Sequence, residues 1–185
     1  MDSENPSEDP VATAAVDAAE TAEDACEIEK EKKAMDFYQR LRSKIGIQLD
    51  GHEESGKGAT YDRLVAALYV LPDMFHLGVK CIFDKTIPIE NKGALVLAVG
   101  YVISPIDLVP DFIPIGGWLD DLLVMTMGLN KFLDLDKSAV RAAVEKHWAG
   151  EGDVLDTVKH VLAVGDAAIE FLPKKFLSVV KSMFA

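Results

Sequence analysis

The sequence predicts an all-α protein of five to seven helices, a small helical domain built around a proline-interrupted hydrophobic helical hairpin, with an acidic N-terminal arm. Three observations predict this class. Apolar residues recur at helical spacing in most segments after residue 34. Glycine, proline or a helix-capping side chain separates one such segment from the next. A long apolar run in the middle of the chain meets a set of prolines, and a second helical pattern follows it.

The central hairpin occupies residues 93–132. Its first part, residues 93–106, is too long and too uniformly apolar for a surface helix. It is also too short to cross a bilayer alone, which takes about 20 apolar residues. Prolines then forbid a continuous helix, because each lacks an amide donor and restricts the residue before it; they are Pro105, Pro110 and Pro114. The helical pattern resumes at Asp120, which we expect to be the N-cap of the second helix.

Amphipathic segments on both sides of the hairpin predict further helices. The first of them is a short helix that docks on the body of the domain, and Pro72 separates the second from the third. Asp153 is the expected start of the last, and Pro173 its end. These predicted helices are residues 35–45, 60–71, 74–83, 139–148 and 154–172.

Charge divides the chain into an acidic arm and a nearly balanced body. Eleven acids and three lysines lie in residues 1–33, within a net charge of −12 for the whole chain. We therefore expect a disordered or partly helical arm at 1–33, a helical domain at 34–172 and a C-terminal helix at 173–185. The arm is a candidate site for a protein partner. The absence of a basic stripe argues against nucleic acid, which needs clustered Lys and Arg.

The C-terminal segment, residues 174–185, has the sharpest amphipathic pattern in the chain. Its lysines and serines fall on one face, and aromatic and aliphatic residues cover the other. This combination suits a helix at a lipid interface, although a terminal helix packed on the core has the same pattern. Two cysteines and the lack of a secretory signal predict a reducing compartment, either the cytoplasm or the cytoplasmic side of a membrane.

Four carboxylates lie in the hairpin, with no basic residue between Lys92 and Lys131. A carboxylate in apolar surroundings must be hydrogen-bonded, paired, metal-bound or protonated. Three interpretations remain open: helix caps in the proline-rich bend, acids in the headgroup layer of a membrane, or ligands of Mg²⁺ or Ca²⁺. A metal enzyme, a hydrolase that activates water, would need distant partners such as His147 or His160. The candidate metal ligands are Asp107, Asp111, Asp120 and Asp121.

The same stretch carries the pattern Y-x-x-S-P-x-D-x-x-P-D, followed by an Asp-Asp pair. It closely resembles the YkvA-like domain of unknown function, a small helical and often membrane-associated domain. The resemblance is best over residues 84–123, within a core that we place at 84–133, and it implies no particular reaction. The matching residues are Tyr101, Ser104, Pro105, Asp107, Pro110, Asp111, Pro114, Asp120 and Asp121.

These observations favour a non-catalytic, membrane-associated helical module whose hairpin inserts shallowly and whose C-terminal helix adds interfacial contact. We expect membrane lipid as its partner and no cofactor. The alternatives are a soluble helical interaction domain, in which the hairpin is an ordinary core, and a hydrolase that depends on a divalent metal. The residues expected to contact the membrane are Phe112, Ile113, Trp118, Lys174, Lys175, Phe176, Lys181 and Phe184.

Overall fold

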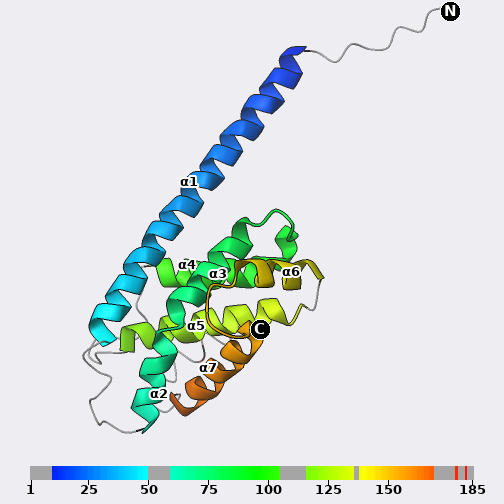
Figure 1. Ribbon diagram of the computed structural model, residues 1–185. Helices are drawn as coiled ribbons and strands as arrows, with labels where there is room; N and C mark the ends of the chain where they lie inside the picture. Colours follow the sequence, from blue (N-terminus) through cyan, green and yellow to red (C-terminus); the bar gives the residue numbers. More distant parts are fainter. Residues whose placement is uncertain are drawn as a thin grey trace, which may run out of the picture.

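The computed structural model describes residues 10–49, 59–104, 116–135 and 138–168, together with Ser178 and Ser182. Every regular element within these residues is a helix, which confirms the predicted all-α class (Figure 1). In chain order the elements are α1 (Pro10–Leu49), α2 (Ala59–Leu68), α3 (Leu71–Phe83), the 3₁₀ turn η1 (Ile89–Asn91), α4 (Gly93–Ile103), α5 (Gly116–Leu133), α6 (Ser138–His147) and α7 (Val154–Ala168).

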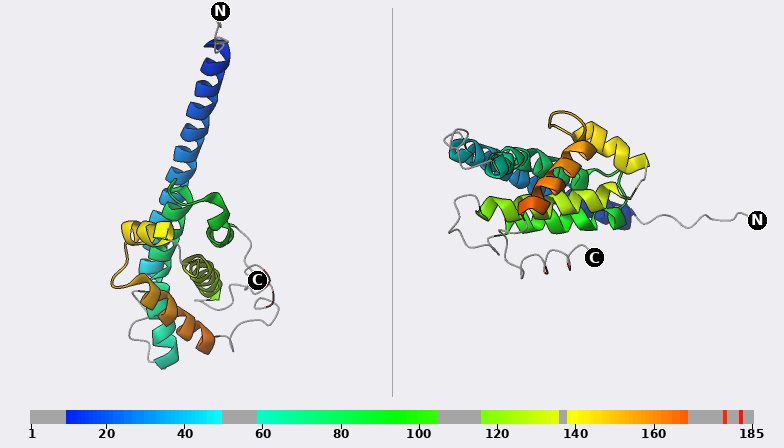
Figure 2. Two further views of the ribbon diagram at one scale, coloured as in Figure 1. Left: turned by 90° about the vertical axis from the view of Figure 1, so that its right-hand side faces the viewer. Right: turned by 90° about the horizontal axis from the view of Figure 1, so that it is seen from below.

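Helix α1 is one continuous helix of 40 residues, about 60 Å long at 1.5 Å per residue. The sequence predicted a short helix at 35–45 after a disordered or partly helical arm, and α1 runs through the expected boundary between arm and domain at residue 33. The extension has a physical reason, because the preceding stretch is rich in alanine and glutamate and contains neither glycine nor proline. Its N-terminal half, blue in Figures 1 and 2, projects away from the body of the domain.

The C-terminal part of α1 docks on the body through the face that its apolar spacing predicts. Ala34, Tyr38, Leu41 and Ile45 are buried, and Arg42 donates a hydrogen bond to the Tyr38 hydroxyl at 2.8 Å on the same helix. The partner of this face is α3. The long helix is therefore anchored at one end by apolar burial, which contributes about 1.5–3 kcal/mol for each large aliphatic side chain fully removed from water.

Helix α3 lies at the centre of the fold and packs against α1, α4, α5 and α6. It begins at Leu71 with Pro72 in its first turn, where the missing amide hydrogen costs nothing. The predicted break between the second and third helices is present, but it lies at residues 69–70, and Pro72 belongs to α3. At Gly78, a β-carbon would lie 2.5 Å from Cε of Met125 and 3.0 Å from Cγ2 of Val99. The absence of a side chain thus lets α4 and α5 approach α3 closely.

The hairpin partners α4 and α5 pack against each other more extensively than any other pair of helices. Helix α7 covers α5 and also contacts α2, with Val158 and Val161 almost fully buried. Asp153 caps α7 as predicted, since its Oδ1 accepts the amide hydrogens of Leu155 at 2.8 Å and Asp156 at 3.1 Å. The core therefore runs through α3, α4 and α5, with the other helices packed around it.

Candidate functional site

The apolar helix α4 has one face in the core and one face in solvent. Its inner positions are buried, namely Leu95, Ala98, Val99 and Val102. On the outer side Val96 is 51% exposed, Leu97 46% and Ile103 45%. No charged residue occurs between Gly93 and Ile103. The adjoining turn η1 adds Ile89, which is 84% exposed. We call Ile89, Val96, Leu97 and Ile103 the α4 outer face.

Gly100 lies between these exposed side chains on α4. A β-carbon at this position would have no heavy atom of the described residues within 4 Å, so packing among these residues does not require glycine there. A glycine inside a helix is less stable than alanine by about 1 kcal/mol. The α4 outer face is therefore flat at its centre, and another molecule can approach the helix backbone there.

Beneath this face, α4 and α5 share a buried polar contact. Asp120 is only 1% exposed, and its Oδ2 accepts a hydrogen bond from the Tyr101 hydroxyl at 2.9 Å. Its Oδ1 accepts the amide hydrogen of Asp121 at 3.0 Å. A buried carboxylate is costly without such donors, and Tyr101 supplies one from the opposite helix of the hairpin. The contact therefore fixes the register of α4 against α5.

The prediction that Asp120 caps the second helix of the hairpin is wrong, because α5 begins four residues earlier, at Gly116. The reason lies in the apolar pattern. Leu119 is buried one residue before Asp120, and Leu122 and Leu123 continue the buried side at helical spacing. Burial of this side of α5 therefore begins upstream of the carboxylate. Asp120 lies inside the helix and contacts its hairpin partner.

The four predicted metal ligands fall partly outside the described residues. Asp107 and Asp111 lie there, so their position relative to the other two stays untested. Asp120 is buried against Tyr101, and Asp121 is half-buried beside it. Within residues 10–49, 59–104, 116–135 and 138–168, no three His, Cys, Asp or Glu residues gather closely enough to hold a metal ion. The metal interpretation therefore depends on residues 105–115.

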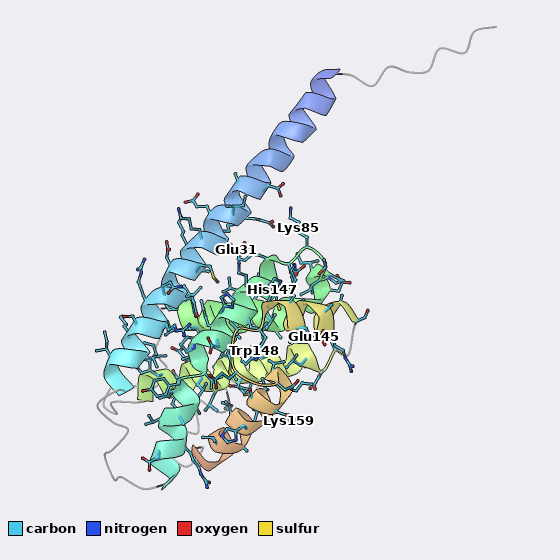
Figure 3. All side chains as sticks on the ribbon, in the orientation of Figure 1. Glu31, Lys85, Glu145, His147, Trp148 and Lys159 are labelled. Atoms are coloured by element: carbon cyan, nitrogen blue, oxygen red, sulfur yellow. The ribbon has the colours of Figure 1, made fainter. Side chains whose placement is uncertain are left out.

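The two histidines considered as distant catalytic partners lie elsewhere. His160 is exposed on α7. His147, at the end of α6, contacts Asp84, which follows α3, with 2.7 Å between Nε2 and Oδ2. Lys146 donates to the same oxygen at 3.3 Å, while Thr86 donates its amide hydrogen and hydroxyl to Oδ1 at 2.9 and 2.6 Å. We call Asp84, Thr86, Lys146 and His147 the Asp84 cluster (His147 is labelled in Figure 3).

The side chain of Asp84 is only 4% exposed, so the Asp84 cluster surrounds a buried carboxylate with donors. The Thr86 hydrogen bonds above all, then the contacts with His147 and Lys146, hold the pKa of Asp84 well below its usual range. The cluster joins the end of α3 to the end of α6 and is a structural link. The contact between Asp84 and Thr86 could be predicted from the local sequence, since Asp followed two residues later by Thr is a common turn pattern. The contact with His147, 63 residues away, has no local signal.

Of the residues predicted to contact a membrane, one lies within the described part of the chain and the others lie outside it. Trp118 is half-buried and packs against the core. The remaining seven lie outside the described residues, and their contacts stay predictions: Phe112, Ile113, Lys174, Lys175, Phe176, Lys181 and Phe184. Ser178 and Ser182, on the predicted polar face of the C-terminal segment, are helical and exposed.

One stretch of the described chain, Val65–Phe83, is long and apolar enough by length and composition to span a membrane. Most of it is buried in the core, and it is divided between α2 and α3. The core helices of soluble proteins pass the same test, so this stretch is only weak evidence for a membrane protein. The shorter α4 is the apolar helix that has an exposed side.

Comparison with known proteins finds a family model that is similar to the hairpin and leaves its role open. Residues 91–127, which include α4 and most of α5, match the model of a family described as a protein of unknown function, DUF1232. The predicted resemblance to the YkvA-like domain is thereby confirmed over these residues. Comparison with curated proteins and with solved structures returned no significant match.

Proposed function

We propose that this protein is a non-catalytic helical module that docks on the cytoplasmic face of a membrane through the α4 outer face. The observation that carries the proposal is the exposed, uncharged side of α4. Three half-exposed aliphatic side chains lie on α4 and Ile89 is exposed on the adjoining turn η1, while the opposite side of α4 already supplies the core. Large exposed apolar surfaces commonly mark sites of contact with another molecule or a membrane.

The dimensions of α4 favour shallow docking. Its 11 residues extend about 16 Å, roughly half the 30 Å thickness of a bilayer's hydrocarbon core. Burying the remaining exposed surface of four aliphatic side chains gives about 4–5 kcal/mol before the cost of association. This is the range of weak, reversible attachment, so further contacts would have to strengthen it. The predicted amphipathic segment at 174–185 is the candidate for such a contact.

Vesicle flotation with a matched pair of variants tests the proposal. Leu97 on α4 and Leu155 on α7 are 46% and 45% exposed, so Leu97→Asp and Leu155→Asp make the same chemical change at equal exposure on different surfaces. We expect the wild type and Leu155→Asp to float with vesicles of phosphatidylcholine and phosphatidylserine, and Leu97→Asp to stay behind. Equal flotation of the two variants, or no flotation of the wild type, would contradict docking through α4.

A soluble interaction domain is the second candidate, and Gly100 is the observation in its favour. The open space above this glycine lets a partner helix approach the α4 backbone. Gly100→Leu separates the two functions, because leucine adds apolar surface for lipid but obstructs a closely packed helix. We expect Gly100→Leu to float at least as well as the wild type. Loss of flotation would contradict lipid docking through the α4 outer face.

A further inference from the structure

A second candidate surface lies on α1. It does not involve α4, and it is acidic whereas the α4 outer face is uncharged. Acidic residues occur on α1 at positions 17, 20, 24, 27 and 31, in steps of three and four. Positions with this spacing share one face of a helix. Like charges at such spacing destabilise an isolated helix by a few tenths of a kcal/mol per pair. This row of acidic residues therefore lowers the stability of α1 itself.

The part of this face nearest the body borders a groove of about 290 Å³. One wall belongs to α1, with Asp24, Glu27, Ile28 and Glu31. The other belongs to the end of α3 and the turn after it, with Phe83 and Lys85. Figure 3 shows Glu31 on α1 and Lys85 on the facing side. The groove is therefore formed where α1 leaves the body of the domain.

Two ion pairs hold the walls of the groove together. Lys80 on α3 contacts Glu31 with 2.7 Å between Nζ and Oε1, and Lys85 contacts Asp24 with 2.7 Å between Nζ and Oδ1. Both pairs are partly exposed, so each contributes little to stability; they connect α1 to the end of α3 and the turn after it. Glu27, between them in sequence, has no ion-pair partner among the described residues.

The groove also contains apolar surface. Ile28 is 67% exposed on α1, and Phe83 is half-buried and packs against the core behind it. Among the side chains that the structure describes, Lys80 pairs with Glu31 and Lys85 with Asp24, whereas Glu27 has no ion-pair partner and leaves this part of the face negative. A binder of this surface therefore needs positive charges along one line and an apolar side chain among them.

We propose that this surface binds a lysine- or arginine-rich amphipathic helix of a partner protein, lying along α1 with an apolar side chain against Ile28 and Phe83. Charge complementarity favours this occupant, because the carboxylates repel nucleic acid and anionic lipid headgroups. The described carboxylates do not gather into a group able to hold a metal ion, so a linear array of cations fits them better than a single ion.

Titration with a designed helical peptide tests the proposal on the full-length chain. The probe is a 14-residue peptide with lysines in steps of three and four and leucines beside them, about as long as the acidic face. A peptide with glutamate in place of each lysine is its counterpart. Glu27→Lys and Glu29→Lys form the matched pair of variants. They make the same charge change two residues apart, which places them on opposite faces of α1.

We expect the lysine peptide to bind the wild type, its affinity to fall as salt rises, and the glutamate peptide not to bind. Glu27→Lys should weaken binding at least tenfold and Glu29→Lys less than twofold, both with unchanged circular dichroism. Ile28→Ala, which keeps every charge, should weaken binding about threefold through the apolar contact alone. Equal losses in the two lysine variants would overturn the proposal, because attraction would then depend on net charge. Absence of binding, or equal binding of both peptides, would overturn it as well.

Discussion

Replacing Asp84 by asparagine gives the sharpest test of how the body of the domain is held together. The substitution keeps the size of the side chain, removes its charge and turns one acceptor oxygen into a donor. Either the Thr86 donors or the contacts with His147 and Lys146 then lose their acceptor. Hydrogen bonds to a charged group contribute about 1.5–3 kcal/mol each. The contact with Lys146 adds little, because that side chain is 65% exposed.

We therefore expect Asp84→Asn to lower the free energy of unfolding by about 2–4 kcal/mol at pH 7. Urea unfolding followed by circular dichroism measures this difference, with Asp36→Asn at an exposed position inside α1 as the control. The control should change stability by less than about 0.5 kcal/mol. An equal effect of the two substitutions would refute the idea that the Asp84 cluster links α3 to α6.

The same variant has a defined pH dependence. The pKa of Asp84 is held well below its usual range in the folded protein, so this carboxylate stabilises the fold at every pH above its unfolded value of about 3.9. Its contribution is lost as the pH falls below that value through the folded pKa. The difference between wild type and Asp84→Asn should accordingly stay constant from pH 7 to about pH 5 and narrow below about pH 4. A difference that stays constant down to pH 2 would contradict the role of the charge.

Three further predictions concern the core. Tyr101→Phe removes the hydroxyl that donates to the buried Asp120 and should lower the free energy of unfolding by about 1–3 kcal/mol in urea denaturation; an unchanged midpoint would show that this contact is dispensable. Gly78→Val should lower that free energy by about 1–3 kcal/mol or more, whereas Gly100→Ala should raise it by about 0.5–1 kcal/mol, because only the first position is crowded. In native protein at pH 8, a maleimide should label one thiol per chain, since Cys81 is buried and burial raises its pKa to about 12; two labels before unfolding would contradict its burial.

Sequence reasoning predicted the helices well where apolar spacing was strong. The docking residues of α1, a helix break close to Pro72 and the cap at Asp153 all follow from patterns within a few residues. The arm was predicted to be disordered or partly helical, and its continuity with the docked helix was not predicted. An alanine- and glutamate-rich stretch has no apolar stripe, so its helix depends on propensity and on continuation from a docked segment. A criterion based on apolar stripes detects only the part of a helix that packs.

The candidate site was only partly predictable for a related reason. The sequence singled out the apolar run of α4, but its helical faces were too uniformly apolar to show which one would remain exposed. The hydrogen bond from Tyr101 to Asp120 connects residues 19 positions apart in the sequence, and the contact between Asp84 and His147 connects residues 63 positions apart. These contacts depend on how the helices pack. Local spacing rules therefore identify the residues that matter without identifying their partners.

The most direct test of docking through α4 is the environment of single side chains when vesicles are added. A polarity-sensitive fluorophore is attached to cysteine at position 97 or, as the control, at position 155, in a Cys26→Ser background that removes the exposed native thiol. If α4 docks on the membrane as proposed, the emission of the fluorophore at position 97 shifts to the blue and is quenched by a lipid-borne quencher. The fluorophore at position 155 shows neither change. An unchanged spectrum at 97, or equal changes at both positions, would contradict it.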